Sequence, residues 1–231
     1  MSHMLASVNS LKEALMAQQA GVDIIDLKQP AKGALGALNP IDVKRIVNTL
    51  DTTTPISATV GDLPMQAELI VTAVKQMSAT GVDYIKIGFF PDQSWREVIT
   101  QLAPLTQRPL KLIAVLFADQ NPDLETIAHF AEAGFTGIML DTMNKASGSL
   151  TDVMSLNTIQ HFVSTARHYQ LLTGLAGSLR TTDIPLLLPL QADYLGFRGA
   201  LCINHQRTAQ LDYTAMLNIQ TALMAEQTLS A

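Results

Sequence analysis

Residues 19–28 read QAGVDIIDLK, residues 79–88 read ATGVDYIKIG, and residues 132–141 read EAGFTGIMLD. In each stretch a helical segment stops at a glycine, the residue that most often caps a helix C-terminus. A short run rich in Ile, Leu and other strand-forming residues follows at once. The first two stretches share the core GVDxI. This recurrence predicts repeated units in which a helix leads directly into a buried strand.

The same alternation extends over the whole chain. Eight segments predict strands: residues 4–8, 23–28, 55–60, 84–88, 111–117, 137–141, 171–176 and 194–198. Helical periodicity marks residues 10–20, 65–80, 94–103, 123–133, 157–168 and 203–225, whereas residues 29–50 and 177–193 are less regular. Eight strands with helical crossovers predict an α/β fold, a single (β/α)8 TIM barrel over residues 4–231.

A doubly wound open sheet is the alternative to the barrel. Such a sheet usually carries a glycine-rich phosphate loop after its first strand. Here SVNSLKEA, residues 7–14, follows that strand and contains no glycine. The barrel is therefore the favoured fold.

The composition fits one well-cored domain. The chain has 231 residues, of which 48% are hydrophobic and 15% charged, with a net charge of −5. This balance gives no reason to expect a nucleic acid or a membrane as a partner. A lone cysteine, Cys202, excludes an internal disulfide and a multi-cysteine metal site.

The first residues of the chain and the length of its apolar runs indicate the cellular compartment. Residues 1–3 precede Met4 in MSHM and resemble an expression remnant. No apolar run reaches 18 residues, and no signal peptide is recognisable. We therefore expect a cytoplasmic protein.

Charged residues occur where the predicted strands end. Residues two apart share one face of a strand, so Asp26 and Lys28 point the same way. If the intervening apolar residues pack against helices, both face the barrel interior near its C-terminal mouth, where barrel enzymes carry out their chemistry. Lys86 has the same aspect on the fourth strand, Asp141 ends the sixth, and Lys145 follows on the loop.

Three lysines and two aspartates should therefore converge at one end of the barrel. Any one of them could be a structural ion pair, but stability alone poorly explains the whole set. An amine near other cations in a desolvated pocket has a lowered pKa. One of these lysines would then be nucleophilic enough to form a Schiff base, while the aspartates balance charge and move protons.

The last two strands end in GLAGSLR (residues 174–180) and GFRGA (residues 196–200). Barrels often bind phosphate with the loops after strands 7 and 8. Backbone N–H groups at these glycine pairs could hold an anion, with further donors from the Ser178 hydroxyl or from Arg198. Ordinary turns are the alternative. The predicted phosphate-binding residues are Gly177, Ser178, Arg198, Gly199 and Ala200.

Other candidate residues carry a weaker signal. The histidines of the helical segments show no ligand spacing, and no metal or cofactor motif occurs, so we expect neither a metal nor a cofactor. We predict surface or packing roles for His129, His161, His168, His205, Cys202 and Trp95.

Five stretches together resemble a known family. DIIDLKQPAKGALGA, DYIKIGFF, LDTMNKASGSL, GLAGSL and GFRGA are similar to segments of the (5-formylfuran-3-yl)methyl phosphate synthase family, and the similarity covers essentially the whole chain. This family makes the furan of methanofuran and of a similar formyl-carrying cofactor in methylotrophic bacteria. The resemblance implies a (β/α)8 barrel that joins two glyceraldehyde 3-phosphate molecules into 4-(hydroxymethyl)-2-furaldehyde phosphate, losing phosphate and water.

The resemblance also implies roles for individual residues. The Schiff-base lysine of the family corresponds to Lys28, with Asp26 as its buried partner. Its second strand-borne lysine corresponds to Lys86, and its acid–lysine pair to Asp141 and Lys145. The imine would act as an electron sink, and the resulting enamine would attack the aldehyde of a second triose.

Two other function classes remain as alternatives. One is another Schiff-base barrel enzyme, such as a class I aldolase, or a phosphosugar isomerase. The other is a catalytically silent barrel that binds a phosphorylated metabolite. In the favoured interpretation the partner is a small triose phosphate, and we expect a homo-oligomer because barrels of this size often associate.

Overall fold

The computed structural model describes residues 2–51, 53–91, 94–106 and 110–229, with the side chains of residues 226–229 left aside. In this part of the chain, parallel strands close into a barrel in chain order, with β8 pairing β1. The strands are β1 His3–Val8, β2 Ile24–Leu27, β3 Ile56–Thr59, β4 Tyr84–Phe89, β5 Lys111–Phe117, β6 Gly137–Asp141, β7 Leu172–Leu175 and β8 Tyr194–Phe197. The predicted (β/α)8 barrel is confirmed, and a closed barrel excludes the open sheet.

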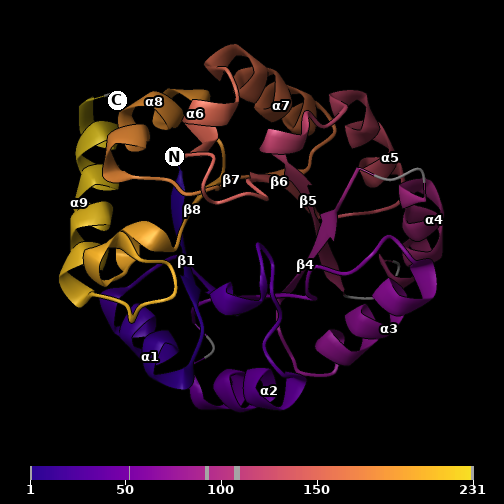
Figure 1. The fold of residues 1–231 in the computed structure, drawn as a ribbon, viewed down its shortest axis with the longest axis horizontal. Coiled ribbons are helices and arrows are strands. Elements are labelled where there is room, and N and C mark those ends of the chain that lie inside the picture. Colours follow the sequence, from indigo (N-terminus) through magenta and orange to yellow (C-terminus); the bar gives the residue numbers. More distant parts are fainter. Residues whose placement is uncertain (1, 52, 92–93, 107–109, 230–231) are drawn as a thin grey trace.

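Helices form a ring outside the strands (Figure 1). They are α1 Leu11–Ala20, α2 Pro40–Thr49, α3 Ala67–Ser78, α4 Trp95–Thr106, α5 Ile127–Glu132, α6 Leu150–Val153, α7 Leu156–His168, α8 Ile184–Leu187 and α9 Tyr213–Leu229. Short 3-10 helices are η1 Pro30–Lys32, η2 Ala118–Gln120, η3 Leu124–Thr126, η4 Thr181–Asp183, η5 Leu188–Leu190, η6 Gly199–Leu201 and η7 Ile203–His205. No described helix is long and apolar enough to cross a membrane.

The repeated GVD motif has a structural cause. Gly21 and Gly81 have φ of +75° and +89°, the left-handed conformation that ends a helix. The following aspartates cap the preceding strand: Asp23 accepts a hydrogen bond from the N–H of Met4, and Asp83 accepts one from the N–H of Ile56. One short motif therefore stops a helix, starts a strand and ties it to its neighbour.

The segments that looked irregular contain helices. Residues 29–50 hold η1 and α2, and residues 177–193 hold η4, α8 and η5. Helix α2 begins with Asn39, whose side chain accepts from the N–H of Ile41, and with Pro40 in the first turn. Both are standard helix-start signals, which the sequence prediction did not use.

The last helix differs most from its prediction. It begins at Tyr213 rather than at residue 203. Asn204 and His205 have φ of +54° and +56°, which a continuing α-helix cannot accommodate, and Cys202 forms a β-bridge with Leu211. Residues 202–212 are therefore a folded connection that lies at the barrel mouth, and Cys202 packs there, before the helix rather than at its start.

The first strand and the ordered part of the chain both begin earlier than predicted. Strand β1 begins at His3, one residue before the predicted Met4, and the Ser2 hydroxyl donates to the carbonyl of Ala192. Met1 lies outside the described residues. The ordered barrel thus extends into the stretch that the sequence set apart as a remnant.

The barrel has an apolar floor beneath a polar mouth. Inside the strands, Leu5, Ile24, Val115 and Met139 form one buried cluster with Phe117, Ala176, Ala34 and Leu35. The outer faces of the strands pack against the helices in a larger cluster. Among the ionisable side chains, Lys28 follows β2 and Asp141 ends β6, whereas Asp26 and Lys86 lie within β2 and β4.

Candidate active site

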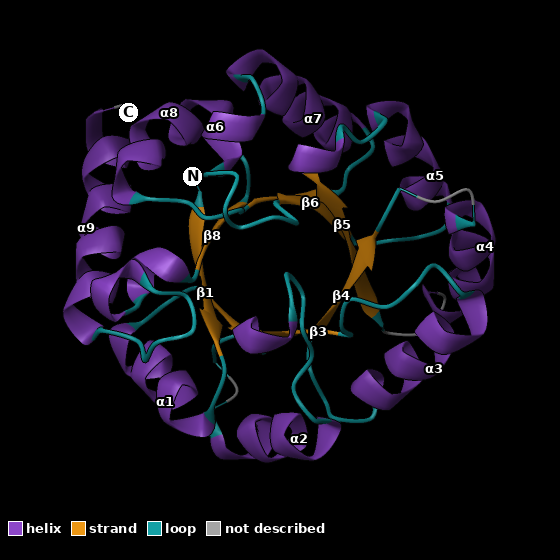
Figure 2. Ribbon diagram, in the orientation of Figure 1, coloured by secondary structure: helices purple, strands orange, loops and turns teal. Residues whose placement is uncertain are grey.

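A single cavity gathers the predicted site residues. It has a volume of about 620 Å³, and Figure 2 shows loops that reach across the barrel mouth above the strands. Its lining includes Lys28, Lys86, Asp141, Lys145, Gly177, Ser178, Arg198, Gly199 and Ala200. Asp26 does not line the cavity but touches Lys86 at its wall.

Asp26 is fully buried within a polar layer of the barrel. The strand register places Ser7 and Ser57 beside it, and their hydroxyls donate to its carboxylate over 2.9 and 2.7 Å. Lys86 Nζ lies 2.7 Å from Asp26 Oδ1. Burial raises the pKa of Asp26, but Lys86, Lys28 and these hydrogen bonds outweigh it and lower the pKa. Asp26 is thus a permanent anion paired with Lys86.

Among the described residues, Lys28 has its ion-pair partner, Asp141, at a longer distance than Lys86 has Asp26. Its Nζ lies 4.0 Å from Oδ2 of Asp141, and its side chain is 8% exposed. Burial lowers the pKa of Lys28, Asp141 and Asp26 oppose this, and Lys86 and Lys145 lower it further, to about 8. The expectation that Asp26 is its direct partner is wrong, because Asp26 pairs with Lys86. Lys28 is therefore a buried amine with a substantial neutral fraction near pH 8.

Asp141 lies between two lysines. Its Oδ1 is 2.5 Å from Lys145 Nζ and also accepts from the N–H of Thr142, while its Oδ2 faces Lys28. Burial raises the pKa of Asp141, but the two lysines and these hydrogen bonds lower it to about 2. Lys145 also donates to the carbonyl and hydroxyl of Thr142. The carboxylate can therefore stabilise charge on either amine.

The loop that carries Lys145 is held by a neighbouring strand end. Asp119, in η2 after β5, accepts hydrogen bonds from the N–H groups of Met143 and Asn144. These bonds turn the chain back over the mouth directly after β6. The DTxxK spacing therefore brings the amine back to the carboxylate four residues earlier.

Gly177 allows a very close approach between two loops. Its φ is +108°, and a Cβ atom there would lie 2.8 Å from Cγ2 of Thr142. Ser178 follows with φ of +48°. In the described part of the chain, the backbone N–H groups of Gly177, Ser178, Gly199 and Ala200 donate no hydrogen bond to a backbone carbonyl outside the regular helices and strands. Consecutive N–H groups in this kind of conformation can form an anion-binding nest.

Arg198 was predicted to bind a phosphate, but its side chain makes other contacts. Its guanidinium pairs with Glu13, with Nη1 2.6 Å from Oε2, and both side chains are buried. The remaining N–H groups donate to the backbone carbonyls of Ser7, Arg207 and Ala209. All of its donors are occupied, so the prediction that Arg198 donates to a phosphate is wrong. It ties β8 to α1 and to residues 207–209 instead.

Sequence reasoning missed the part of the cavity wall that comes from the connection between β8 and α9. His205 and Arg207, in the connection between β8 and α9, both line the cavity. Arg207 Nη2 donates to the carbonyl of Gly33 over 2.8 Å, which joins this connection to the loop after β2. The predicted helix over residues 203–225 concealed them, because it placed both on the outer ring.

The KGALGA motif, residues 32–37, forms a loop after β2. Asp62 accepts hydrogen bonds from the N–H groups of Ala34 and Leu35, and a Cβ atom on Gly33 would lie only 1.9 Å from Oδ2 of Asp62. Leu35 is 1% exposed and packs in the interior cluster with Phe117. Gly33 therefore allows the close approach of the loop to Asp62, and Leu35 packs into the barrel interior.

Comparison with solved structures agrees with the fold. A 3-hexulose-6-phosphate synthase gives a TM-score of 0.66 at 17% identity, covering 96% of this chain and 99% of the other. A phosphoribosyl anthranilate isomerase from Thermus thermophilus gives 0.65 at 14% identity, covering 100% of both. At such identities the likeness concerns the fold alone.

Sequence relatives are much more similar. A Methylorubrum extorquens protein is 40% identical over 224 residues, 96% of this chain and 92% of its own. Proteins named (5-formylfuran-3-yl)methyl phosphate synthase from Methanococcus maripaludis and Methanopyrus kandleri are each 32% identical. They cover 88% and 86% of this chain, and 91% and 89% of their own lengths. The family model described as 4-HFC-P synthase matches residues 4–220, and this chain therefore belongs to the 4-HFC-P synthase family.

Proposed function

We propose that this protein is a (5-formylfuran-3-yl)methyl phosphate synthase, a lyase that condenses two molecules of glyceraldehyde 3-phosphate through a Schiff base on Lys28. The observation that carries the proposal is the buried Lys28 amine, with a pKa of about 8, at the wall of a cavity beside Asp141. Family membership supports the product, and the site geometry supports the route. In the net reaction, two molecules of glyceraldehyde 3-phosphate contain the same atoms as one furan phosphate, one inorganic phosphate and two water molecules.

Lys28 is the nucleophile in this proposal. Its neutral amine attacks the carbonyl carbon of a triose phosphate, and loss of water gives the imine. The protonated imine withdraws electrons, so the adjacent carbon loses a proton and becomes an enamine. The enamine carbon then forms the new bond to the aldehyde carbon of the second triose, whose oxygen takes up a proton.

The two aspartates support different parts of this chemistry. Asp141 faces Lys28 at 4.0 Å and Lys145 at 2.5 Å, so it is placed to pass protons during phosphate elimination and dehydration. Asp26 stays charged beneath the cavity and keeps the Lys86 ammonium in position. Lys86 then provides a fixed positive charge close to the reacting carbonyl.

The backbone N–H groups of Gly177, Ser178, Gly199 and Ala200 hold one substrate phosphate in this proposal. They lie on the loops after β7 and β8, on the wall of the same cavity as Lys28. Holding the phosphate there orients the triose so that its carbonyl reaches the amine. Ring closure and loss of two water molecules then give an aromatic furan, which favours the forward direction. Hydrolysis of the imine uses one water molecule and frees both the product and the Lys28 amine.

Incubation with glyceraldehyde 3-phosphate alone tests the function. We expect a near-ultraviolet absorbance that grows with time and a product with the mass of the furan phosphate. An aldolase would give an adduct without that absorbance, and a silent binder would give no borohydride-trapped imine. Lys28→Arg should form no product, because a guanidinium cannot form the imine, whereas Lys44→Arg on the exposed face of α2 should match the native protein.

A further inference from the structure

The cations at the cavity wall differ in how they are neutralised. Lys28 and Lys145 share Asp141, Lys86 pairs with Asp26, and Arg198 pairs with Glu13. Arg180 pairs with Asp152 and Asp183. Among the cations of the cavity wall, Arg207 alone has no carboxylate within ion-pair distance in the described part of the chain.

Arg207 also differs from the other cavity cations in how many of its N–H groups are free to bind a ligand. A guanidinium has five N–H groups, and in the described residues one from Arg207 is engaged, with the carbonyl of Gly33. Lys145, by contrast, uses its ammonium on Asp141 and Thr142. Arg207 therefore has far more capacity to bind an added anion than Lys145.

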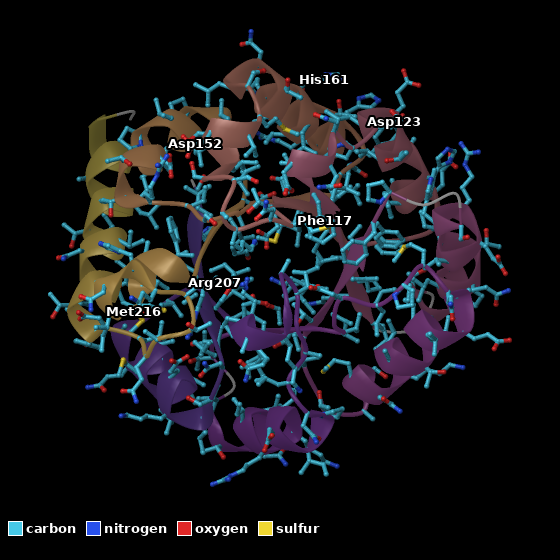
Figure 3. All side chains as sticks on the ribbon, viewed as in Figure 1. Phe117, Asp123, Asp152, His161, Arg207 and Met216 are labelled. Atoms are coloured by element: carbon cyan, nitrogen blue, oxygen red, sulfur yellow. The ribbon has the colours of Figure 1, made fainter. Side chains whose placement is uncertain are left out.

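The backbone around Arg207 is held firmly by buried groups. Arg198 donates to the carbonyls of Arg207 and Ala209, and Glu13 accepts from the N–H of Leu211. The side chain of Arg207 is partly buried, and Figure 3 shows it on the inner side of the β8–α9 connection, toward the barrel mouth. Holding an unpaired charge in a partly desolvated position costs free energy, which an anionic ligand would offset.

We propose that Arg207 binds the phosphate of the second triose, at an anion site separate from the backbone N–H groups of Gly177, Ser178, Gly199 and Ala200. The inference rests on the proposed function, which requires two phosphorylated substrates in one cavity. The fork of a guanidinium matches two phosphate oxygens at once. The bond to Gly33 keeps this fork above the cavity, between the β8 side of the mouth and the loop after Lys28.

Arg207 also has the charge that this role needs. Burial lowers the pKa of its guanidinium, while Asp141 and Asp62 oppose this shift. An arginine stays protonated at neutral pH after such a shift. It cannot replace Lys28 in imine formation, so its contribution is to binding rather than to covalent chemistry.

Calorimetric titration with inorganic phosphate tests the site directly. We expect two phosphates per chain in the native protein and one in Arg207→Gln. In turnover, Arg207→Gln should raise KM for glyceraldehyde 3-phosphate by about tenfold or more, the usual effect of losing a charge-assisted bond, and still give the borohydride-trapped imine. Arg45→Gln, which removes an exposed arginine from α2, should match the native protein in both measurements.

The Arg207 site and the synthase function can be contradicted separately by these measurements. If the native protein binds one phosphate, or if Arg207→Gln still binds two with an unchanged KM, the Arg207 site is wrong while the synthase function stands. If the native protein makes no furan but loses one phosphate site in Arg207→Gln, the anion site stands and the synthase function is wrong. Should Arg207→Gln not fold, Arg207→Lys decides, because an unchanged phosphate stoichiometry and KM in that variant would overturn the bidentate contact.

Discussion

The Nζ atom of Lys86 lies 2.7 Å from Oδ1 of Asp26, and this ion pair occupies the carboxylate that Lys28 would otherwise share. Both partners are buried, with Asp26 also bonded to Ser7 and Ser57. In the described part of the chain, Lys28 is left with Asp141 at 4.0 Å as its closest carboxylate. Lys86 is therefore held in a close ion pair, whereas Lys28 has its carboxylate at a longer distance, although both line one cavity.

The first prediction concerns the pH at which Lys28 reacts. Only the neutral amine attacks a carbonyl, so the rate of imine trapping by borohydride should rise through a pH of about 8. An exposed lysine would need a pH near its ordinary pKa of 10.5. Mass spectrometry should place the label on the peptide that contains Lys28. A label on Lys86 or Lys145, or a midpoint near 10.5, contradicts the assignment.

The second prediction concerns stability. The pKa of Lys28 falls from 10.5 to about 8 on folding, so burial of its charge costs about 3 kcal/mol below pH 8. This cost fades between pH 8 and 10.5 and is absent above that range. Lys28→Met should therefore raise the free energy of unfolding at pH 7 and lose this gain at high pH, as measured by urea denaturation. Lys44→Met on α2 should show no such gain.

A destabilised Lys28→Met protein at pH 7 would mean that the charge of Lys28 supports Asp141 more than burial opposes it. The variant should in any case make no furan. A substitution that stabilises the protein and abolishes its activity is expected where a strained or desolvated side chain takes part in catalysis.

The third prediction concerns Asp141. Asp141→Asn should still trap substrate with borohydride but make furan about 100-fold more slowly, because a charge stabilised in a desolvated site is commonly worth about 3 kcal/mol. The charge of Asp141 also raises the pKa of Lys28. The midpoint of imine trapping should therefore move below pH 8. Asp42→Asn, on the exposed face of α2, is the matched control.

Near-normal furan synthesis by Asp141→Asn would make the carboxylate a structural partner of Lys145 and nothing more. The rate of furan synthesis decides between the two roles. The shift of the trapping midpoint reports the charge of Asp141 near Lys28, which is present whether or not Asp141 moves protons.

The fourth prediction concerns phosphate binding at Gly177. A Cβ atom added there meets Thr142 at 2.8 Å, at a φ of +108° that favours glycine. Gly177→Ala should distort the backbone N–H groups and weaken competitive inhibition by inorganic phosphate about tenfold or more. Gly21→Ala is the control, because Gly21 has φ of +75° with nothing within 4 Å of an added Cβ. Equal inhibition of both variants by phosphate would contradict the predicted anion site.

Local sequence patterns decided the barrel and much of the site. Glycine C-caps and period-two alternation operate within a few residues, so they marked the strands and showed that Asp26, Lys28 and Lys86 face inward. The GVD aspartates act on a neighbouring strand, yet their position in the repeat is local. For the same reason Asp141 and Lys145, four residues apart, could be paired from the sequence.

Which charged side chains form ion pairs depended on the closure of the barrel. Arg198 pairs with Glu13, 185 positions away, because closure places β8 beside β1. Arg207 reaches the cavity because left-handed residues at Asn204 and His205 interrupt the predicted helix and the connection folds back over the mouth. Ion pairs depend on distance in space and on burial, and no local periodicity carries either. The sequence by itself therefore determined which side chains point into the barrel. Tertiary structure decided that Lys86 pairs with Asp26 and that Arg207 has no carboxylate partner among the described residues.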